Sequence, residues 1–185
     1  MSDFLRTGGK LALICAVAAA TLALVNAVTE PRIEMLRRAR QAEILGPHVL
    51  GDAYMGDEEK VAADNVRTLF RVYANADDSK IGYVLELRGN GYAGPMTVLA
   101  YYDRAAVIQF AKLMENEETP GIGKIFEDES KLEFMIGAGG DRAIPTRKGD
   151  LSGAAADIVS GATVTFQGIA AILKAGSEYV GQLEG

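Results

Sequence analysis

One uncharged apolar run near the start of the chain constrains its architecture more than any other feature. Residues 11–28, LALICAVAAATLALVNAV, contain no charged side chain, and only Thr21 and Asn26 are clearly polar. The run has 18 residues, close to the about 20 that an α-helix needs to cross the hydrocarbon core of a bilayer. Arg6 and Lys10 precede it. The run therefore predicts a helix that crosses a membrane.

A cleavable signal peptide is the alternative interpretation of the same segment. Residues 25–27, Val-Asn-Ala, would make an acceptable cleavage site after the apolar run. We expect residues 1–30 to remain as an uncleaved anchor in the lipid bilayer, because the chain retains Met1. A lipoprotein signal is not expected, because Cys15 follows Ile14 rather than a small residue.

Charge divides the chain into a basic N-terminal part and an acidic remainder. The net charge is −6; residues 1–40 carry six basic and three acidic side chains, which leaves −9 for the rest. Nucleic acids bind positive surfaces, so we expect no nucleic-acid partner. The cluster of Arg37, Arg38 and Arg40 would favour a cytoplasmic domain, but this rule is weak for long domains, and charge leaves the orientation open.

The scarcity of cysteine and histidine excludes several kinds of chemistry. The chain has one cysteine, Cys15, one histidine, His48, and no tryptophan. An intrachain disulfide cannot form, and no cluster exists for zinc, haem or an iron–sulfur centre. Nucleophilic catalysis based on Cys15 or His48 lacks suitable neighbours. We expect no metal site, and any redox chemistry would need an organic cofactor.

Strand-like runs predict an antiparallel sheet in the folded part of the chain. Residues 69–73, 81–87 and 96–102 are predicted strands, separated by turn-forming segments. Residues 164–179 place apolar side chains at helical spacing and predict a helix. The composition of residues 105–117 favours a helix, although a strand could begin within it. The predicted class is α+β, an antiparallel sheet with packed helices after one transmembrane helix.

The segment between the anchor and the sheet is predicted to form a stem. Residues 31–50 have the pattern of an amphipathic helix that ends at Gly46 and Pro47. Residues 51–65 are polar and acidic, and we expect a loop with a little helix. The predicted organisation is thus an anchor, a stem and linker over residues 31–65, and a folded domain over residues 66–185.

Three hydroxyl side chains precede the last predicted helix. Ser160, Thr163 and Thr165 lie around Gly161. Ser160 or Thr163 could cap the helix by accepting backbone N–H bonds. The same free N–H groups and the positive end of the helix dipole would also suit a phosphate. Spacing alone does not decide between these interpretations.

Three motifs together resemble the covalent FMN-binding domain family. Residues 157–163, Asp-Ile-Val-Ser-Gly-Ala-Thr, resemble its flavinylation motif. Residues 118–123, Glu-Thr-Pro-Gly-Ile-Gly, resemble its Glu-Thr-Pro-Gly-Leu-Gly loop, with Ile122 in place of leucine. Residues 91–95, Gly-Tyr-Ala-Gly-Pro, resemble the segment that opens one of its central strands. The motifs follow the family's order, so the resemblance covers nearly the whole chain.

The resemblance implies specific roles. Thr163 would carry FMN through a phosphoester bond made by a separate flavin transferase, whereas Thr165 becomes an ordinary first-turn residue. The residues that would shape the turn or be read by the transferase are Asp157, Ser160, Gly161 and Ala162. The residues that would bind the cofactor from the opposite wall are Tyr92, Glu118, Thr119, Pro120 and Gly121. The same resemblance implies a strand within residues 105–117.

Within this family the chain is most similar to the G subunit of the Rnf complex, an ion-translocating ferredoxin:NAD oxidoreductase. That similarity implies an electron-carrier subunit without a complete active site of its own, partnered by other Rnf-type membrane and iron–sulfur subunits. It also implies single-pass anchoring in the inner (cytoplasmic) membrane, with the flavin domain on the extracytoplasmic side. The alternatives are the C subunit of a sodium-translocating NADH:quinone oxidoreductase, a free-standing extracytoplasmic flavoprotein, and a flavin-free membrane-anchored scaffold or binding module.

Overall fold

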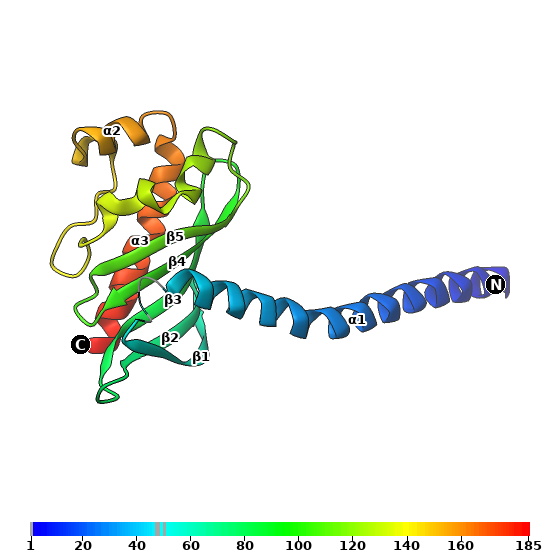
Figure 1. Ribbon diagram of the computed structural model, residues 1–185. Helices are drawn as coiled ribbons and strands as arrows, with labels where there is room; N and C mark the ends of the chain where they lie inside the picture. Colours follow the sequence, from blue (N-terminus) through cyan, green and yellow to red (C-terminus); the bar gives the residue numbers. More distant parts are fainter. Residues whose placement is uncertain (1, 47–48, 50) are drawn as a thin grey trace. The chain divides into compact units, whose positions relative to one another are not determined.

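A computed structural model describes residues 2–46, 49 and 51–185 of the chain. Pro47 and His48 lie outside the described residues. The described residues form two units, one ending at Gly46 and one from Val49 to Gly185. The first unit is a helix, and the second contains the sheet and the remaining helices (Figure 1).

The first unit is the single helix α1, Ser2–Leu45. Pro31 lies inside it, so the prediction of a separate helix starting at residue 31 is wrong. A proline at this place removes one backbone hydrogen bond, but the apolar turns before it and the charged turns after it still continue as one helix. The predicted end is confirmed, because the helix stops at Leu45 and Gly46 is a turn residue.

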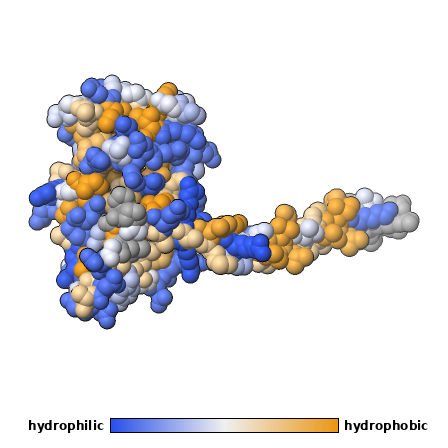
Figure 2. Space-filling view, viewed as in Figure 1, coloured by the Kyte–Doolittle hydropathy of each residue, from blue (hydrophilic) through white to orange (hydrophobic). Residues whose placement is uncertain are grey.

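Helix α1 is long and apolar enough over Thr7–Leu45 to cross a membrane. Figure 2 shows hydrophobic side chains along its visible face. The hydroxyls of Thr21 and Thr29 donate to the carbonyls of Val17 and Val25, each at 2.8 Å. Polar atoms that are satisfied within their own helix cost less in an apolar solvent, so these threonines are compatible with a membrane.

The second unit is built on a five-stranded antiparallel sheet in the order β1-β2-β3-β4-β5. The strands are β1 Ala53–Ala63, β2 Val66–Ala74, β3 Lys80–Asn90, β4 Pro95–Asp103 and β5 Ile108–Asn116. Strands β2, β3 and β4 confirm the three strands predicted from the sequence. Successive strands are neighbours throughout, so each connection is a hairpin.

Strand β1 was not predicted. Residues 51–65 were expected to form a loop, but Ala53–Ala63 pairs with β2, with register irregularities after Met55 and after Lys60. As an edge strand it tolerates the charges and bulges that made its sequence resemble a loop. The folded unit therefore begins before residue 66, and the linker is shorter than predicted.

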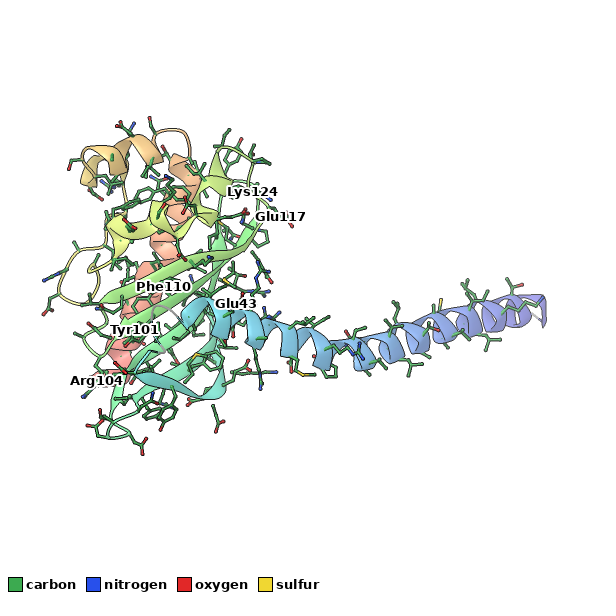
Figure 3. All side chains as sticks on the ribbon, in the orientation of Figure 1. Glu43, Tyr101, Arg104, Phe110, Glu117 and Lys124 are labelled. Carbon is green, nitrogen blue, oxygen red and sulfur yellow. The ribbon has the colours of Figure 1, made fainter. Side chains whose placement is uncertain are left out.

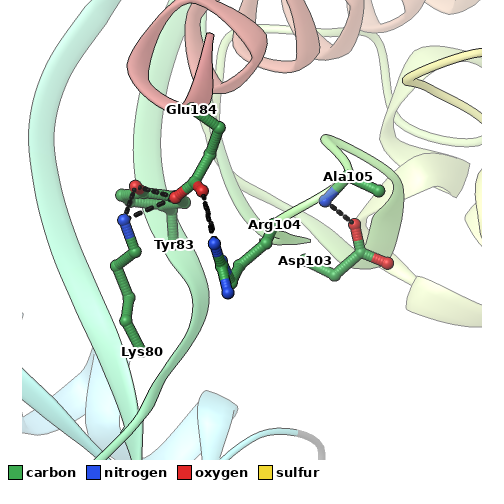
Figure 4. Close-up of polar contacts among 6 residues, drawn as sticks. All are labelled: Lys80, Tyr83, Asp103, Arg104, Ala105 and Glu184. Atoms are coloured by element: carbon green, nitrogen blue, oxygen red, sulfur yellow. Dashed lines mark hydrogen bonds and ion pairs between the residues drawn. The ribbon is translucent and has the colours of Figure 1, made fainter.

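Strand β5 resolves the ambiguity of residues 105–117. Arg104 and Ala105 form the preceding turn, in which Asp103 Oδ1 accepts the Ala105 N–H at 2.9 Å (Figure 4) and the Val107 N–H at 3.0 Å. The strand itself spans Ile108–Asn116. Its helix-favouring composition is overridden by pairing with β4 and by burial of alternate side chains, so the family-based strand is confirmed and the helix prediction is wrong.

Helix α3, Thr163–Glu184, covers one face of the sheet and packs mainly on β3 and β4 (Figure 1). This confirms the helix predicted over residues 164–179. Its buried side chains follow helical spacing: Phe166, Ile169, Ala170, Leu173 and Val180. They meet the inner side chains of the sheet: Tyr83, Leu85, Leu87, Met96, Val98, Ala100 and Tyr102. These side chains form most of the largest hydrophobic cluster of the unit.

Shorter elements lie beside β5 and before α3. The 3₁₀-helices are η1 Gly123–Glu127, η2 Glu129–Met135 and η3 Lys148–Asp150, and α2 spans Ala154–Val159. The first two pack on β5. Phe134 of η2 contacts Phe166 with ring centroids 5.9 Å apart. The Phe134–Phe166 contact joins η2 to the beginning of α3.

A four-residue polar cluster fixes the C-terminal end of α3 (Figure 4). Glu184 Oε1 lies 2.5 Å from Lys80 Nζ and accepts the Tyr83 hydroxyl at 2.5 Å. Glu184 Oε2 accepts Arg104 Nε and Nη2 at 3.2 and 3.1 Å. The hydrogen bonds from Lys80 and then Tyr83 lower the pKa of Glu184 to about 2.

The lowered pKa predicts an acid-sensitive contribution to stability. A carboxyl group whose pKa falls on folding stabilises the fold above its unfolded pKa, and this contribution is lost as pH drops towards the folded value. Glu184→Gln should lower the melting temperature of the full chain at neutral pH. The difference from wild type should shrink between about pH 4.5 and about pH 2. A difference that stays constant over that window contradicts the prediction.

Close packing of α3 predicts opposite effects for two glycines of the same helix. A Cβ at Gly168 would overlap the carbonyl oxygen of Asn90 and lie 2.9 Å from Met96 Cε, whereas a Cβ at Gly181 meets nothing within 4 Å. Gly168→Ala should therefore destabilise by about 1–3 kcal/mol. Gly181→Ala should stabilise by about 0.5–1 kcal/mol through helix propensity. Chemical denaturation of both variants checks this, and equal effects would contradict the packing argument.

Candidate functional site

Glu118 joins the three sequence motifs at one end of the sheet. Its side chain is buried, with a residue exposure of 3%. Glu118 Oε1 accepts the backbone N–H groups of Tyr92 and Ala93 at 2.7 and 3.2 Å. Glu118 Oε2 accepts the Thr165 hydroxyl at 2.8 Å. One carboxylate thus connects the β3–β4 turn, the segment after β5 and the first turn of α3.

The loop that carries Glu118 is shaped by its own turn residues. The side chain of Asn116 accepts the Glu118 N–H at 3.0 Å and turns the chain at the end of β5. Pro120 and Gly121 then form a reverse turn, in which the Ile122 N–H donates to the Thr119 carbonyl at 3.1 Å. Gly121 has φ +76°, as a type II turn requires.

Two motif glycines make room for the Glu118 carboxylate. A Cβ at Gly91 would overlap Glu118 Oε1, and a Cβ at Gly123 would overlap Glu118 Oε2. A side chain at either position would therefore displace the carboxylate from its three donors. Gly91 and Gly123 lie in different motifs, but both leave space for the same carboxylate.

These segments enclose a pocket of about 350 Å³ at the N-terminal end of α3. Its lining residues are Tyr92, Glu118, Thr119, Ile122, Gly161, Ala162, Thr163, Val164 and Thr165. Six of the ten predicted site residues are among them: Tyr92, Glu118, Thr119, Gly161, Ala162 and Thr163. The structure places Pro120 and Gly121 in the adjoining turn and Asp157 and Ser160 on the approach to α3, outside the lining.

Thr163 is the first residue of α3 and lines this pocket. Its side chain is half-buried, and its hydroxyl donates to the Val159 carbonyl at 3.2 Å. The residue before the helix is Ala162, and no side chain caps the helix end. The prediction that Ser160 or Thr163 caps this helix is therefore wrong. The first backbone N–H groups of α3 remain available on the pocket side.

Ser160 follows the last residue of α2, and its side chain contacts a cation and not the start of α3. Lys148 Nζ donates to Ser160 Oγ at 2.8 Å. Lys148 is held in η3, where Asp150 accepts the N–H groups of Thr146 and Arg147 at 2.9 and 2.8 Å. The hydrogen bonds from Arg147 and then Thr146 lower the pKa of Asp150. A positive charge therefore lies beside the segment that leads into Thr163.

Sequence reasoning assigned no role to four residues at or near the pocket: Ile122, Val164, Thr165 and Lys148. Thr165 lies in the first turn of α3 as expected, but it is also buried and donates to Glu118, a contact that was not foreseen. No sequence signal links positions 47 apart. Val164 is the one of these residues that the sequence could have indicated, because helical spacing places it on an exposed side of α3 next to Thr163.

The pocket residues fit a phosphorylated aromatic ligand. Tyr92, Ile122 and Val164 expose 73%, 48% and 50% of their surface around the pocket. Exposed apolar side chains at a pocket rim favour a flat apolar ligand. The uncapped helix end and the hydroxyl of Thr163 supply donors and a positive dipole for a phosphate. The donor set and the rim therefore fit FMN.

Comparison with known proteins identifies the class of this domain. A family model described as FMN-binding domain matches residues 91–178, and a second, described as RnfG N-terminal region, matches residues 2–46. The first match begins at Gly91 and contains every residue that lines the pocket. The second unit of the chain therefore contains an FMN-binding domain.

Two relatives identify the family. The G subunit of the ion-translocating oxidoreductase complex of Methanosarcina acetivorans is 30% identical over 95% of this chain and 93% of its own. The protein of the same name from Erwinia tasmaniensis is 24% identical over 100% of this chain and 94% of its own. The chain belongs to the family of G subunits of ion-translocating oxidoreductase complexes.

A solved structure also resembles the chain. It is the crystal structure of the C subunit of the Na(+)-translocating NADH-quinone reductase from Parabacteroides distasonis. The TM-score is 0.46 with 23% identity, and the match covers 78% of this chain and 82% of that one.

The contacts of Glu118 predict a large stability effect for one of two adjacent acids. Glu118→Ala removes the acceptor of the Tyr92 and Ala93 N–H groups and should cost about 2–3 kcal/mol of unfolding free energy. Glu117 is exposed, so Glu117→Ala should change it by less than about 0.5 kcal/mol. Denaturant titration of both variants checks this. Similar losses in the two would show that the carboxylate does not hold the segments together.

Proposed function

We propose that this chain is a membrane-anchored electron-transfer subunit that carries FMN covalently on Thr163, within an Rnf-type ion-translocating oxidoreductase complex. Family membership supports the complex, and the match to the FMN-binding domain supports the cofactor. When bound, FMN supplies one- and two-electron transfer. The protein's part is to hold it in place and to set its surroundings.

The position of the Thr163 hydroxyl is the single observation that carries the covalent assignment. It lies at the first position of an uncapped helix, in the lining of the pocket, with Gly161 and Ala162 beside it. Both neighbours are small and leave the approach to the oxygen open. A phosphate on this oxygen would lie at the positive end of the α3 dipole. Thr165 is less suited, because it is buried and engaged with Glu118.

In the attachment step, Thr163 Oγ1 forms a bond to the FMN phosphorus of FAD, the diphosphate bond breaks, AMP leaves and the hydroxyl proton passes to solvent. A separate flavin transferase would promote this step. An esterified oxygen has no proton, so Thr163 can no longer donate to the Val159 carbonyl. Asp157 and Ser160 are exposed, and Ser160 is hydrogen-bonded to Lys148. We therefore expect the transferase to recognise this turn through Asp157 and the Ser160–Lys148 pair.

The remaining pocket residues would orient the cofactor. Tyr92 and Ile122 offer apolar surface for a flat ring, and Thr119 offers a hydroxyl on the opposite wall. Pro120 and Gly121 fix the turn that places Thr119 and Ile122 on the same side. The residues of this chain provide binding and orientation, and the site needs no acid or base for electron transfer.

Helix α1 supports anchoring in the membrane. It meets the length and apolarity of a membrane-spanning helix over Thr7–Leu45, and its two central threonines are satisfied internally. We propose that it fixes the chain in the inner (cytoplasmic) membrane with the flavin domain on the extracytoplasmic side. A covalent bond suits an exported site, because the cofactor cannot diffuse away. Other membrane and iron–sulfur subunits of the complex would exchange electrons with it.

The test of the attachment site compares two substitutions of one residue. The full chain is produced together with a flavin transferase, and its intact mass and in-gel flavin fluorescence are measured. Wild type should carry one FMN. Thr163→Val, which keeps the shape but lacks the hydroxyl, should have the mass of the bare polypeptide, whereas Thr163→Ser should retain flavin in at least part of the molecules.

Two outcomes would contradict this assignment. Wild-type protein with the mass of the bare polypeptide would exclude covalent FMN. Flavin on Thr163→Val that disappears in Thr165→Val would move the attachment point to the next hydroxyl of α3.

A further inference from the structure

The Glu118 carboxylate is buried and is held by neutral hydrogen-bond donors. Among the residues that the structure describes, no lysine or arginine forms an ion pair with it. Its three partners are the backbone N–H groups of Tyr92 and Ala93 and the hydroxyl of Thr165. Burial of a carboxylate is costly unless hydrogen bonds compensate it, and here only neutral donors do so.

The hydrogen bonds of Glu118 suit an ionised carboxylate. Both oxygens of Glu118 act as acceptors, Oε1 from two N–H groups and Oε2 from a hydroxyl. A backbone N–H can only donate, and an ionised carboxylate can only accept, so the arrangement suits the anion. The charge also lies in the lining of the pocket that contains Thr163.

Two electrostatic features of the pocket oppose each other. The N-terminus of α3 is equivalent to about half a positive charge, and it is uncapped. Glu118 contributes a full negative charge next to the same helix turn, through Thr165. At comparable distances a full charge outweighs about half a charge, so the carboxylate makes the electrostatic potential in the pocket more negative. Two described cations near the motifs do not line the pocket: Lys148 is directed to Ser160, and Lys124 lies 3.8 Å from Glu127.

We propose that Glu118 lowers the reduction potential of the flavin held in this pocket. This inference rests on the proposed function. Each electron added to the flavin brings negative charge into the pocket, and a fixed anion in the lining makes that addition less favourable. Glu118 is thus a residue that sets the potential, and it does so through its charge rather than by contact chemistry.

The experiment compares two adjacent glutamates in the full-length, flavin-loaded chain. Glu118→Gln keeps the shape, and its amide can accept from the Tyr92 and Ala93 N–H groups while donating to the Thr165 hydroxyl. Glu117→Gln removes the same charge from the exposed neighbour, which lies at the same end of the sheet (Figure 3). Potentials are measured by spectroelectrochemical titration of each protein after intact-mass analysis has shown its flavin content.

Glu118→Gln should favour reduction by on the order of tenfold in the equilibrium constant for one electron, which corresponds to a rise of about 59 mV. Glu117→Gln should shift the potential by much less, because solvent screens an exposed charge. Glu118→Asp, which keeps the charge, should remain closer to wild type than Glu118→Gln. Equal shifts for the Asp and Gln variants would show a structural effect instead of a charge effect and would overturn the inference.

The remaining outcomes are also decisive. Wild-type protein without flavin overturns both the proposed function and this inference, whereas loaded Glu118→Gln with an unchanged potential overturns this inference alone. If Glu118→Gln does not fold or load, Thr165→Val takes its place. That variant keeps the carboxylate but removes one donor that offsets its charge, so the potential should fall below wild type. An unchanged or higher potential in Thr165→Val would count against the proposal.

Discussion

The site depends on one buried carboxylate that accepts hydrogen bonds from two distant segments of the chain. Glu118 holds the turn between β3 and β4 through backbone N–H groups and the first turn of α3 through Thr165. Without it, these segments would lose the polar contacts that fix their relative position at the pocket. The pocket walls are therefore defined by a hydrogen-bond network, whereas the hydrophobic core lies further along the sheet between α3 and β3–β4.

Helix α3 links this site to the rest of the domain. Its apolar side chains cover one face of the sheet, and its C-terminal Glu184 is held by Lys80, Tyr83 and Arg104. With its far end fixed in this way, the helix presents its uncapped N-terminus at the opposite end of the sheet. A rigid element that ends in free donors is well suited to hold an anionic group in a defined place.

Much of the fold could be predicted from the sequence because its patterns are local. Strands β2, β3 and β4 are apolar, β-branched and aromatic runs bounded by turn residues, and α3 places its apolar side chains at helical spacing. Strand β1 could not be predicted, because an edge position permits the acidic, bulged sequence that resembles a loop. Residues 105–117 favoured a helix by composition, and pairing with β4 overrode that preference.

The site could be predicted only in part, because its motifs are local in the sequence but the contacts that join them are not. The motifs identified Tyr92, Glu118, Thr119 and Thr163 as candidate site residues, and the structure places all four in the lining of one pocket. The sequence left open whether Ser160 or Thr163 caps α3, and in the structure the Thr163 hydroxyl donates to the Val159 carbonyl instead of accepting from the helix end. The Thr165–Glu118 bond joins positions too far apart in the chain for any local pattern to reveal it.

The close approach of Gly91 and Gly123 to Glu118 has a consequence for how this sequence can change. A Cβ at either glycine would overlap a carboxylate oxygen of Glu118, and it would also lie 2.7 Å from Met96 Sδ (at Gly91) or from Glu118 Cβ (at Gly123). Replacement of either glycine first would collide with the carboxylate, whereas prior shortening of Glu118 would relieve part of the overlap. The three positions should therefore behave epistatically, and the order in which substitutions accumulate should determine which of them is tolerated.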